Sequence, residues 1–306
     1  MQQWNFQLEQ ALGSQYALTL GYIGVHGVHL TRTRDINLFP EVPLPGTIAG
    51  GGSVTYFAHP GATGPSRPNP AFGRISLFES GADSIYNGGF VQLTKRFSTN
   101  FQVLASYTLA KTIDDAPDAT SVVVPNSGDD TKVAQNTLAP NQERGRGVND
   151  IRQRFVFSAV WDLTYAQSLH NTVLKGLLTH WTVSSITALQ TGAPVSVGVT
   201  GDPNNDTNNN SDRPPGIGRN TLTGPGLATV DLRLTREIRL AERARLRLIG
   251  EGFDITNRAN FATIQQNQYT FSRGVFTLIG NYLAKLSMAP QGAGSRVFQL
   301  AAKITF

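Results

Sequence analysis

The sequence contains no cysteine among its 306 residues, and charged residues make up only 15% of the chain. The first absence excludes disulfide bonds, thiolate metal sites and cysteine nucleophiles. The second sets the chain apart from an average soluble domain, in which roughly a quarter of the residues are charged. An apolar fraction of 40% is too high for a chain that stays disordered. The chain is therefore expected to fold, and the absence of cysteine is compatible with secretion.

Long apolar runs are missing as well. No stretch of about 18 apolar residues occurs, because polar residues interrupt the apolar segments at alternate positions. This pattern excludes membrane-spanning helices, so the chain could cross a bilayer only as a closed β-barrel. Met1 is followed at once by the strand-like segment Trp4 to Glu9, with no basic and apolar leader. We expect either a cytoplasmic protein or a chain whose N-terminal part lies upstream.

The charge pattern and the motifs exclude two further classes. The net charge is +5 and the isoelectric point is about 9.6, but the basic residues are spread along the chain and form no recognition helix. We therefore expect no nucleic-acid partner. The sequence also lacks G-x-S-x-G, H-E-x-x-H, a P-loop and a G-x-G-x-x-G after a strand. These absences favour a binding or transport protein over an enzyme.

Alternation of apolar and polar residues dominates the chain. From Phe155 to Leu163, apolar residues at odd positions alternate with largely polar residues at even positions. Such segments run about ten residues, the length that a tilted strand needs to cross a bilayer. The best helical pattern is short, at residues 173–178. The alternation predicts nine strands, at residues 3–12, 15–31, 86–97, 101–112, 154–164, 181–191, 229–239, 243–256 and 295–306.

The predicted strands are joined by alternately short and long connections. Tight turns are expected at 13–15, 98–100 and 240–242, and long segments rich in Gly, Pro, Asn and Asp at about 40–84, 113–150, 192–227 and 257–294. Outer-membrane barrels show this asymmetry, because their periplasmic turns are short and their extracellular loops are long. One connection, 165–180, should be short and is not. Since single-chain bacterial barrels have an even number of strands, the pattern predicts an all-β, antiparallel transmembrane β-barrel that is part of a larger one.

Several groups of residues form one ordered pattern along the chain. They are Tyr22 to Leu30 (Y-x-G-x-x-G-x-x-L), Ser84 to Asn87, Lys95 to Phe97, Ser106 to Lys111 with Asp114 and Asp115, Trp181 with Gln190 to Pro194, Ser211 to Pro214, Phe253 to Phe261 and the terminal strand. This series resembles the Oar-like TonB-dependent receptors of soil bacteria such as acidobacteria. The likeness spans nearly the whole chain, and the ordered matches are jointly specific although each is weak alone.

The resemblance implies a 22-stranded barrel, of which residues 1–306 form the C-terminal segment. It also implies a signal peptide, an N-terminal plug, a segment that contacts the TonB complex and often a small sandwich domain, all of which we expect upstream. Receptors of this class bind a solute and move it through the barrel with energy from the inner membrane. The implied location is the cell outer membrane. The implied partners are membrane lipid, the barrel assembly machinery, the TonB complex and an unidentified solute.

A charged hairpin supplies candidate lumen-lining residues. With a three-residue turn at 240–242, Glu237 would oppose Arg245, and Arg233 would lie diagonal to Glu251. In a barrel this polar face lines the lumen, where it could touch the plug or an acidic solute, whereas on a soluble sheet it would be solvated. The candidates are Arg233, Glu237, Arg239, Arg245, Arg247 and Glu251.

Two further groups raise the question of a metal. The first is a loop with alternating oxygen ligands, as at the start of a calcium site: Asp202, Asp206, Asn208, Asn210 and Asp212. Counting from Asp206, no Gly stands at position six and no Glu at twelve, so a turn-forming, solvated loop is the alternative. The second group is His26 and His29, which point to opposite faces of a strand and are not expected to share a metal. We expect no cofactor unless the loop binds Ca²⁺.

The terminal strand places Phe298, Leu300, Ile304 and Phe306 on one apolar face and ends the chain on an aromatic residue. An aromatic end fits the interfacial girdle of a barrel. We interpret these four residues as an assembly signal for the outer membrane. As a free edge in water, such a strand would invite aggregation.

Two alternatives to the receptor stay open at this point. A passive porin would share the barrel but would lack a plug. A secreted or surface β-sandwich adhesin would use the same alternation to pack two sheets against each other. In a sandwich a second layer covers the apolar flanks, whereas in a barrel these flanks face lipid.

Overall fold

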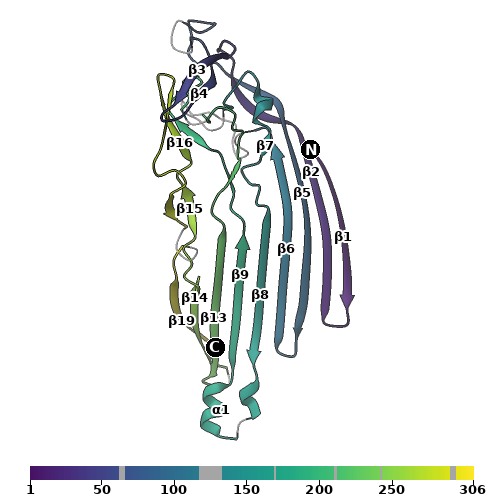
Figure 1. The fold of residues 1–306 in the computed structure, drawn as a ribbon. Coiled ribbons are helices and arrows are strands. Elements are labelled where there is room, and N and C mark those ends of the chain that lie inside the picture. The colour runs from purple at the N-terminus through teal and green to yellow at the C-terminus, as the bar shows by residue number, and fades with distance from the viewer. Residues whose placement is uncertain (62–65, 117–132, 169, 210–211, 242, 290–293) are drawn as a thin grey trace.

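The computed structural model describes residues 1–61, 66–116, 133–168, 170–209, 212–241, 243–289 and 294–306. Nine long strands stand side by side in one curved sheet (Figure 1), and each pairs antiparallel with the next along the chain. They are β1 Gln2–Leu12, β2 Tyr16–Asp35, β5 Ser76–Ser98, β6 Phe101–Asp114, β8 Gln153–Leu163, β9 Trp181–Gln190, β13 Leu227–Arg239, β14 Arg245–Phe253 and β19 Val297–Thr305. The nine predicted strands and the antiparallel all-β fold class are confirmed.

The pairing register keeps apolar side chains on one face of the sheet. Side chains alternate between faces along a strand, so an in-register ladder gives each face its own character. One row on the first face joins Leu8, Leu20, Val91, Tyr107, Phe155, Leu189 and Ala228. The adjacent row, on the opposite and more polar face, joins Glu9, Thr19, Gln92, Ser106, Val156, Ala188 and Thr229.

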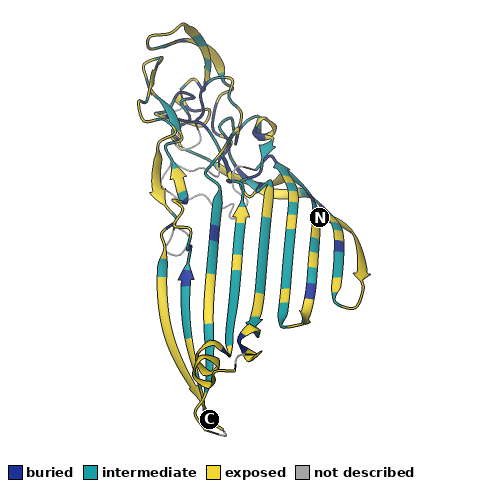
Figure 2. Ribbon diagram, turned by 60° about the horizontal axis from the view of Figure 1, so that its bottom comes forward, coloured by how far each residue is buried: buried dark blue, intermediate teal, exposed yellow. Residues whose placement is uncertain are grey.

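Within the described residues, no second layer covers the apolar face. Phe6 is 67% exposed and Leu300 is 87% exposed, and few residues along the nine strands are buried (Figure 2). A β-sandwich would bury these side chains between two sheets. The sandwich alternative is therefore wrong, and the structure is a partial barrel whose apolar face requires lipid.

Aromatic rings lie across glycines of neighbouring strands. A Cβ atom at Gly21 would collide with the ring of Phe90, and one at Gly24 would collide with the indole of Trp4. Glycine leaves the backbone uncovered there, so each ring can lie flat against the sheet. This close approach explains why glycines interrupt otherwise regular strand patterns.

At the lower end of Figure 1, short turns join the strands with one exception. Gly13, Thr99 and Asn100 have positive φ angles that close the first two turns. The exception is the link between β8 and β9, which holds the 3-10 helix η3 (Tyr165–Ser168) and the helix α1 (Thr172–Leu178). The short helix expected at 173–178 is thereby confirmed. No helix in the described parts of the chain is long and apolar enough to cross a membrane.

At the other end, the four long connections form one structured body, which we call the loop cluster (residues 36–75, 115–152, 191–226 and 254–296, where described; Figure 1). Its largest sheet has the order β11 Gly198–Thr200, β16 Asn267–Ser272, β17 Val275–Leu278, β3 Val42–Ile48 and β4 Ser53–Ala58. The smaller elements are β10 Pro194–Val195 with β12 Leu222–Thr223, β15 Phe261–Ile264 with β18 Lys285–Met288, β7 Gly145–Arg146 and the 3-10 helix η2 Pro140–Glu143. Three of the four connections thus contribute strands to one sheet.

Strands β2 and β5 are longer than the alternation predicts. A bulge between Gly27 and Leu30, with a positive φ at His29, shifts their register, and pairing then continues to Asp35. Beyond the bulge, Arg32 and Arg34 each contact Glu79 at 2.7 Å. In this part of the hairpin, cross-strand ion pairs connect the two strands in place of apolar side chains. The hairpin therefore continues past the apolar part of the sheet to the loop cluster.

Candidate functional site

The charged hairpin of β13 and β14 has a longer turn than the sequence predicts. Arg239 pairs with Arg245, so five residues and not three separate the two strands. Glu237 therefore lies directly opposite Arg247, and Arg233 lies directly opposite Glu251, which corrects the predicted register by two positions. The physical reason is that the backbone N–H groups of residues 240 and 241 both bind the carbonyl oxygen of residue 244. A shift of two positions leaves every side chain on its predicted face.

The structure brings the hairpin charges together on the polar face. Glu237 accepts hydrogen bonds from Arg245 at 2.9 Å and from Arg247 at 3.1 Å. Arg233 contacts Glu251 at 2.6 Å, and Arg239 lies at the end of the ladder opposite Arg245. The three paired guanidinium groups are 51–55% exposed, so screening keeps each pair weak. Their role in the lumen stays a prediction.

Buried ion pairs lie where the strands meet the loop cluster, and we call them the rim network (Asp114, Glu143, Arg213 and Arg219). Arg213 binds the Glu143 carboxylate through two hydrogen bonds of 2.6 and 3.0 Å. Arg219 donates to the backbone carbonyl of Glu143 at 2.9 Å and contacts the Asp114 carboxylate. All four side chains are 9% exposed or less.

The rim network joins three parts of the chain. Asp114 ends β6, Glu143 belongs to the connection 115–152, and both arginines belong to the connection 191–226. Removing one partner from such a buried pair leaves an uncompensated charge and costs about 3–5 kcal/mol. The network therefore ties two loops to the end of a spanning strand.

A second buried pair ties the first loop to β2. Arg67 contacts Asp35 at 2.7 Å, and both side chains are at most 3% exposed. The same carboxylate accepts hydrogen bonds from the backbone N–H groups of Asn37 and Ile75. Arg67 also donates to the carbonyl oxygen of Asp206, in the third connection. Arg67 thus connects the first and the third connection to the end of β2.

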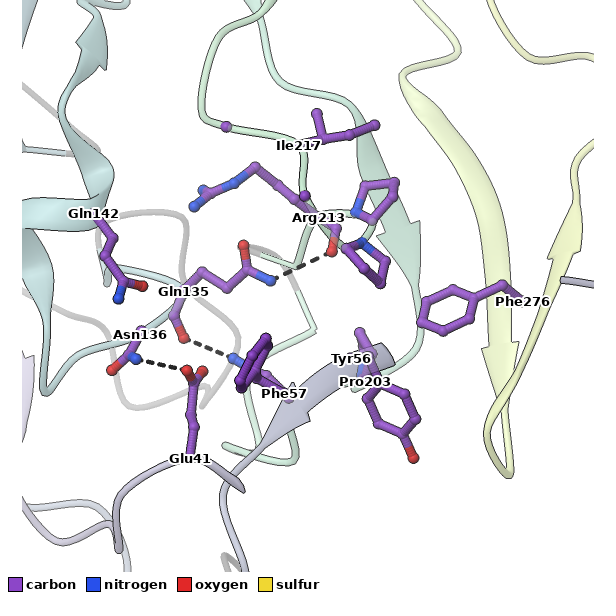
Figure 3. A pocket seen from close by; sticks show the side chains of 15 residues that line it. Glu41, Tyr56, Phe57, Gln135, Asn136, Gln142, Pro203, Arg213, Ile217 and Phe276 are labelled. Atoms are coloured by element: carbon purple, nitrogen blue, oxygen red, sulfur yellow. Dashed lines mark hydrogen bonds between the residues drawn. The ribbon is translucent and has the colours of Figure 1, made fainter. Parts of the chain in front are cut away.

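A pocket of about 250 Å³ lies in the loop cluster (Figure 3). Its lining combines hydrogen-bonding side chains with aromatic and proline side chains, and Glu41 and Asn136 lie away from Tyr56 and Phe276 in the view of Figure 3. The hydrogen-bonding residues include Glu41, Gln135, Asn136 and Gln142, and the aromatic and proline residues are Tyr56, Phe57, Phe276, Pro203, Pro214 and Pro215. Such a lining can pack an apolar part of a small solute while binding its polar groups.

Glu41 is the acidic group of this pocket. Its carboxylate accepts a hydrogen bond of 2.6 Å from the Asn136 side chain. Burial raises the pKa of Glu41, and the hydrogen bond from Asn136 opposes that rise. The Glu41 carboxylate can present a hydrogen-bond acceptor to a bound solute.

Two buried titratable groups belong to the same region. His59 is fully buried, its Nδ1 lies 2.6 Å from the carbonyl oxygen of Phe39, and its Nε2 lies 3.8 Å from Glu41. Burial lowers the pKa of His59, because desolvation disfavours the charged form of the ring. Burial also raises the pKa of Asp206 to about 7, and the Asp202 carboxylate adds to that rise. Burial thus shifts the pKa of each of these groups away from its ordinary value.

Comparison with protein families decides the class of the chain. The profile described as "Outer membrane beta barrel domain" matches residues 1–218 and 216–282. The chain belongs to this family. It is accordingly a protein of the outer membrane, and the apolar face of its sheet meets membrane lipid. Short turns mark the periplasmic end of such barrels and long loops mark the outside, so the loop cluster is extracellular.

Comparisons with single proteins add little to this assignment. A search of curated proteins found no significant match. Among solved structures, the siderophore receptor PiuA from Acinetobacter baumannii is similar over 98% of this chain and 28% of that chain. The sequence identity is 10% and the TM-score is 0.45. The outer-membrane barrel segment described here thus spans 28% of the length of that receptor.

The loop that offers a calcium site lies in the extracellular part of this outer-membrane barrel. Both carboxylate oxygens of Asp202 accept backbone N–H groups, from Asp206 and Thr207, and Asp206 accepts the N–H of Asn208. The described residues contain no group of three or more acidic or histidine side chains arranged for a metal. Asn210 lies outside the described residues, and Asp212 is buried in the same loop. Calcium binding stays a prediction.

The structure places the two strand histidines and the apolar residues of the terminal strand. His26 precedes the bulge and His29 lies within it, and His26 binds Asp83 through Nε2 at 2.8 Å. The apolar residues of the terminal strand share the lipid-facing side, where Phe298 lies opposite Gly252 and Ile304 opposite Leu246. A role of Phe298, Leu300, Ile304 and Phe306 in assembly stays a prediction.

Sequence reasoning missed the pocket altogether. Its residues come from all four long connections, for example Glu41, Asn136, Arg213 and Phe276. No local spacing links positions so far apart in the sequence. The one available signal was the segment Ser211 to Pro214, which belongs to the family-like series and contributes Arg213 to the rim network of this barrel.

Proposed function

We propose that this chain is the C-terminal barrel segment of an Oar-like TonB-dependent receptor, which binds a solute at the cell surface and moves it through the barrel. The observation that carries the proposal is the pocket in the loop cluster, because all four long connections contribute to its lining. A passive pore has no need to fold its loops into one body with a shared pocket. The task in this proposal is binding and not bond-making.

The free edges of the sheet support the part of the proposal that concerns the rest of the protein. In the described residues, β1 and β19 are the outermost strands, and each pairs with a neighbour on one side alone. Unpaired backbone groups are too costly in lipid, so closure takes further strands. A 22-stranded barrel with a plug and a TonB-contacting segment, encoded upstream, would supply them. The barrel assembly machinery would then insert the whole protein.

The polar face supplies the path that a bound solute would take. In the proposal, the solute passes from the pocket towards the hairpin charges, which meet the plug or the solute itself. The residues concerned are Arg233, Glu237, Arg239, Arg245, Arg247 and Glu251. Four of these six residues are arginines and two are glutamates, so the group carries a net positive charge and favours an acidic solute.

Conductance separates a receptor from a passive porin without knowledge of the solute. The natural full-length protein is inserted into a planar bilayer between potassium chloride solutions, and the current is recorded. A plugged receptor should show no steady open state, and urea, which loosens a plug, should create one. A steady ohmic current in the untreated protein would favour the porin.

Energy coupling is tested by binding. The periplasmic domain of the host's TonB, immobilised on a sensor, should bind the full-length protein and should not bind a variant that lacks the TonB-contacting segment alone. Equal signals from both proteins would contradict the TonB-dependent assignment.

A further inference from the structure

The helix α1 presents an apolar face that the described protein leaves uncovered. Val173, Leu174, Leu177 and Leu178 are 70%, 47%, 53% and 39% exposed. At 3.6 residues per turn, these four side chains fall within an arc of roughly 140°, and Lys175 lies outside it. A link at the short-turn end needs no helix, so an amphipathic one requires a separate reason.

Two side chains from the lipid-facing side of the sheet hold α1. The indole Nε1 of Trp181 donates to the carbonyl oxygen of Leu177 at 2.9 Å, and Arg236 donates to that of Gly176 at 2.5 Å. Trp181 and Arg236 are paired across β9 and β13 and share the face of Leu163 and Val183 by alternation. The end of α1 is therefore fixed on the outer wall of the barrel and not in the lumen.

Trp181 and Arg236 also mark the level of the membrane surface. The Arg236 guanidinium lies 5.4 Å from the centre of the Trp181 ring, in a cation–π contact. Tryptophan concentrates at membrane interfaces, and arginine on a lipid-facing strand costs least there. Trp161 lies on the same face, one strand away and opposite Val183. This end of the wall is consequently at the boundary between acyl chains and headgroups.

An apolar groove of about 570 Å³ continues from this point along the same face. Small residues on β14 and β19 create it between larger side chains. Its lining includes Trp181, Leu234, Leu248, Gly250, Leu300 and Ala302. The groove belongs to the lipid-facing surface already established, so its occupant is an acyl chain.

We infer that α1 is an interfacial anchor that seats in the periplasmic leaflet and binds phospholipid. Its four apolar side chains enter the boundary region, one acyl chain lies along the groove, and Arg236 and Lys175 face the phosphate groups. Short helices of this kind lie in the membrane plane with the apolar face buried about 5–10 Å. The inference rests on membership in the outer-membrane barrel family and not on the proposed receptor function.

Spin labelling measures the depth of α1 directly. Val173→Cys carries a nitroxide in the full-length protein in phospholipid nanodiscs, and this chain contributes no other cysteine. Labels at Leu300→Cys on the lipid-facing wall and at Leu278→Cys in the loop cluster calibrate collision with oxygen and with a water-soluble nickel chelate. We expect the label at 173 to favour oxygen, as at 300. A label that favours the nickel chelate, as at 278, would overturn the inference and indicate an aqueous, protein-binding helix.

Lipid dependence supplies an independent measurement. Adding phosphatidylglycerol to the detergent-solubilised protein should raise its Tm, and Leu174→Ser with Leu177→Ser should reduce that rise by at least half. Both side chains are exposed, so the Tm without lipid should stay unchanged. The matched pair Val275→Ser and Leu278→Ser, in the loop cluster, should keep the full rise. An undiminished rise in the α1 variant would contradict the inference.

Discussion

The spanning sheet and the loop cluster differ in what they bury. Side chains on the apolar face of the sheet stay accessible, as Phe6 and Leu300 do, because lipid takes the place of a protein core. The loop cluster instead buries Phe276, His59 and Glu143 to 1% exposure or less. One region therefore relies on its membrane for apolar burial, whereas the other carries its own core outside the membrane.

The core of the loop cluster is largely polar for a physical reason. Between its short strands the connections are irregular, so the backbone groups there need side-chain partners. Asn37 illustrates this role, because its amide donates to the carbonyl oxygens of Asn69, Phe72 and Gly73. Between neighbouring strands of the spanning sheet the ladder itself satisfies the backbone groups.

Breaking the rim network should give the largest effect. Glu143→Ala leaves Arg213 buried without its carboxylate partner, whereas Arg219 keeps Asp114, and the change should destabilise the loop cluster by about 3–5 kcal/mol. Protease cleavage within residues 115–152, measured in vesicles, should then accelerate by more than about a hundredfold. The spanning sheet, followed by its resistance to heat in detergent gels, should stay intact. Loss of both regions together would show that they do not differ as described.

Placing a charge in the wall tests its dependence on lipid. Tyr107→Arg puts a guanidinium on the lipid-facing side of β6 and should cost about 2–4 kcal/mol near the middle of the bilayer. Ser106→Arg, one residue away on the polar face, serves as the matched control and should cost clearly less. Urea titration of the protein in vesicles gives both values. Equal losses would mean that the two faces do not meet different surroundings.

A pH titration tests how the buried carboxyl group of Asp206 contributes to the stability of the loop cluster. The pKa of Asp206 is raised to about 7 in the folded protein, so the folded state binds a proton that the unfolded state has released. Its contribution to stability is complete below about pH 4 and is lost as the pH rises towards 7, by about 1.4 kcal/mol for each pH unit in between.

Asp206→Asn isolates this contribution from that of His59, which opposes it. Relative to the variant, the parent protein should lose protease protection of the loop cluster between about pH 5 and pH 6. A constant difference between the two proteins across that range would exclude a titrating Asp206.

The exposed hairpin should give the smallest change. Glu237→Gln removes the acceptor of Arg245 and Arg247, whose side chains are half exposed, and should cost less than about 1 kcal/mol. Urea titration in vesicles measures the change. A loss as large as that of Glu143→Ala would place Glu237 in a desolvated site.

The sheet could be predicted because its information is local. Alternation from Phe155 to Leu163 defines a strand by itself, and the neighbours follow from short turns. The predicted register of the hairpin was wrong by two positions, because hydrogen bonds to the carbonyl oxygen of Ala244 lengthen its turn. The predicted end of β2 was too early, because Arg32 and Arg34 form ion pairs with Glu79 beyond the point where the apolar pattern stops.

The pocket could not be predicted because its lining residues are far apart in the sequence. Glu41 and Asn136 form a hydrogen bond across 95 residues of sequence, and Arg213 reaches Glu143 across 70. Each residue alone is typical of a solvated loop. Their convergence depends on how four connections fold together, and one sequence does not specify that arrangement locally.

The ring of Phe90 that lies across Gly21 constrains how this wall can change. Any larger residue at Gly21 must first lift the ring, which would then project into the space on the polar side of the sheet. A smaller residue at Phe90 would instead leave the glycine backbone bare to water. A substitution at one of these two positions, which are 69 residues apart in sequence, is therefore expected to require a change at the other.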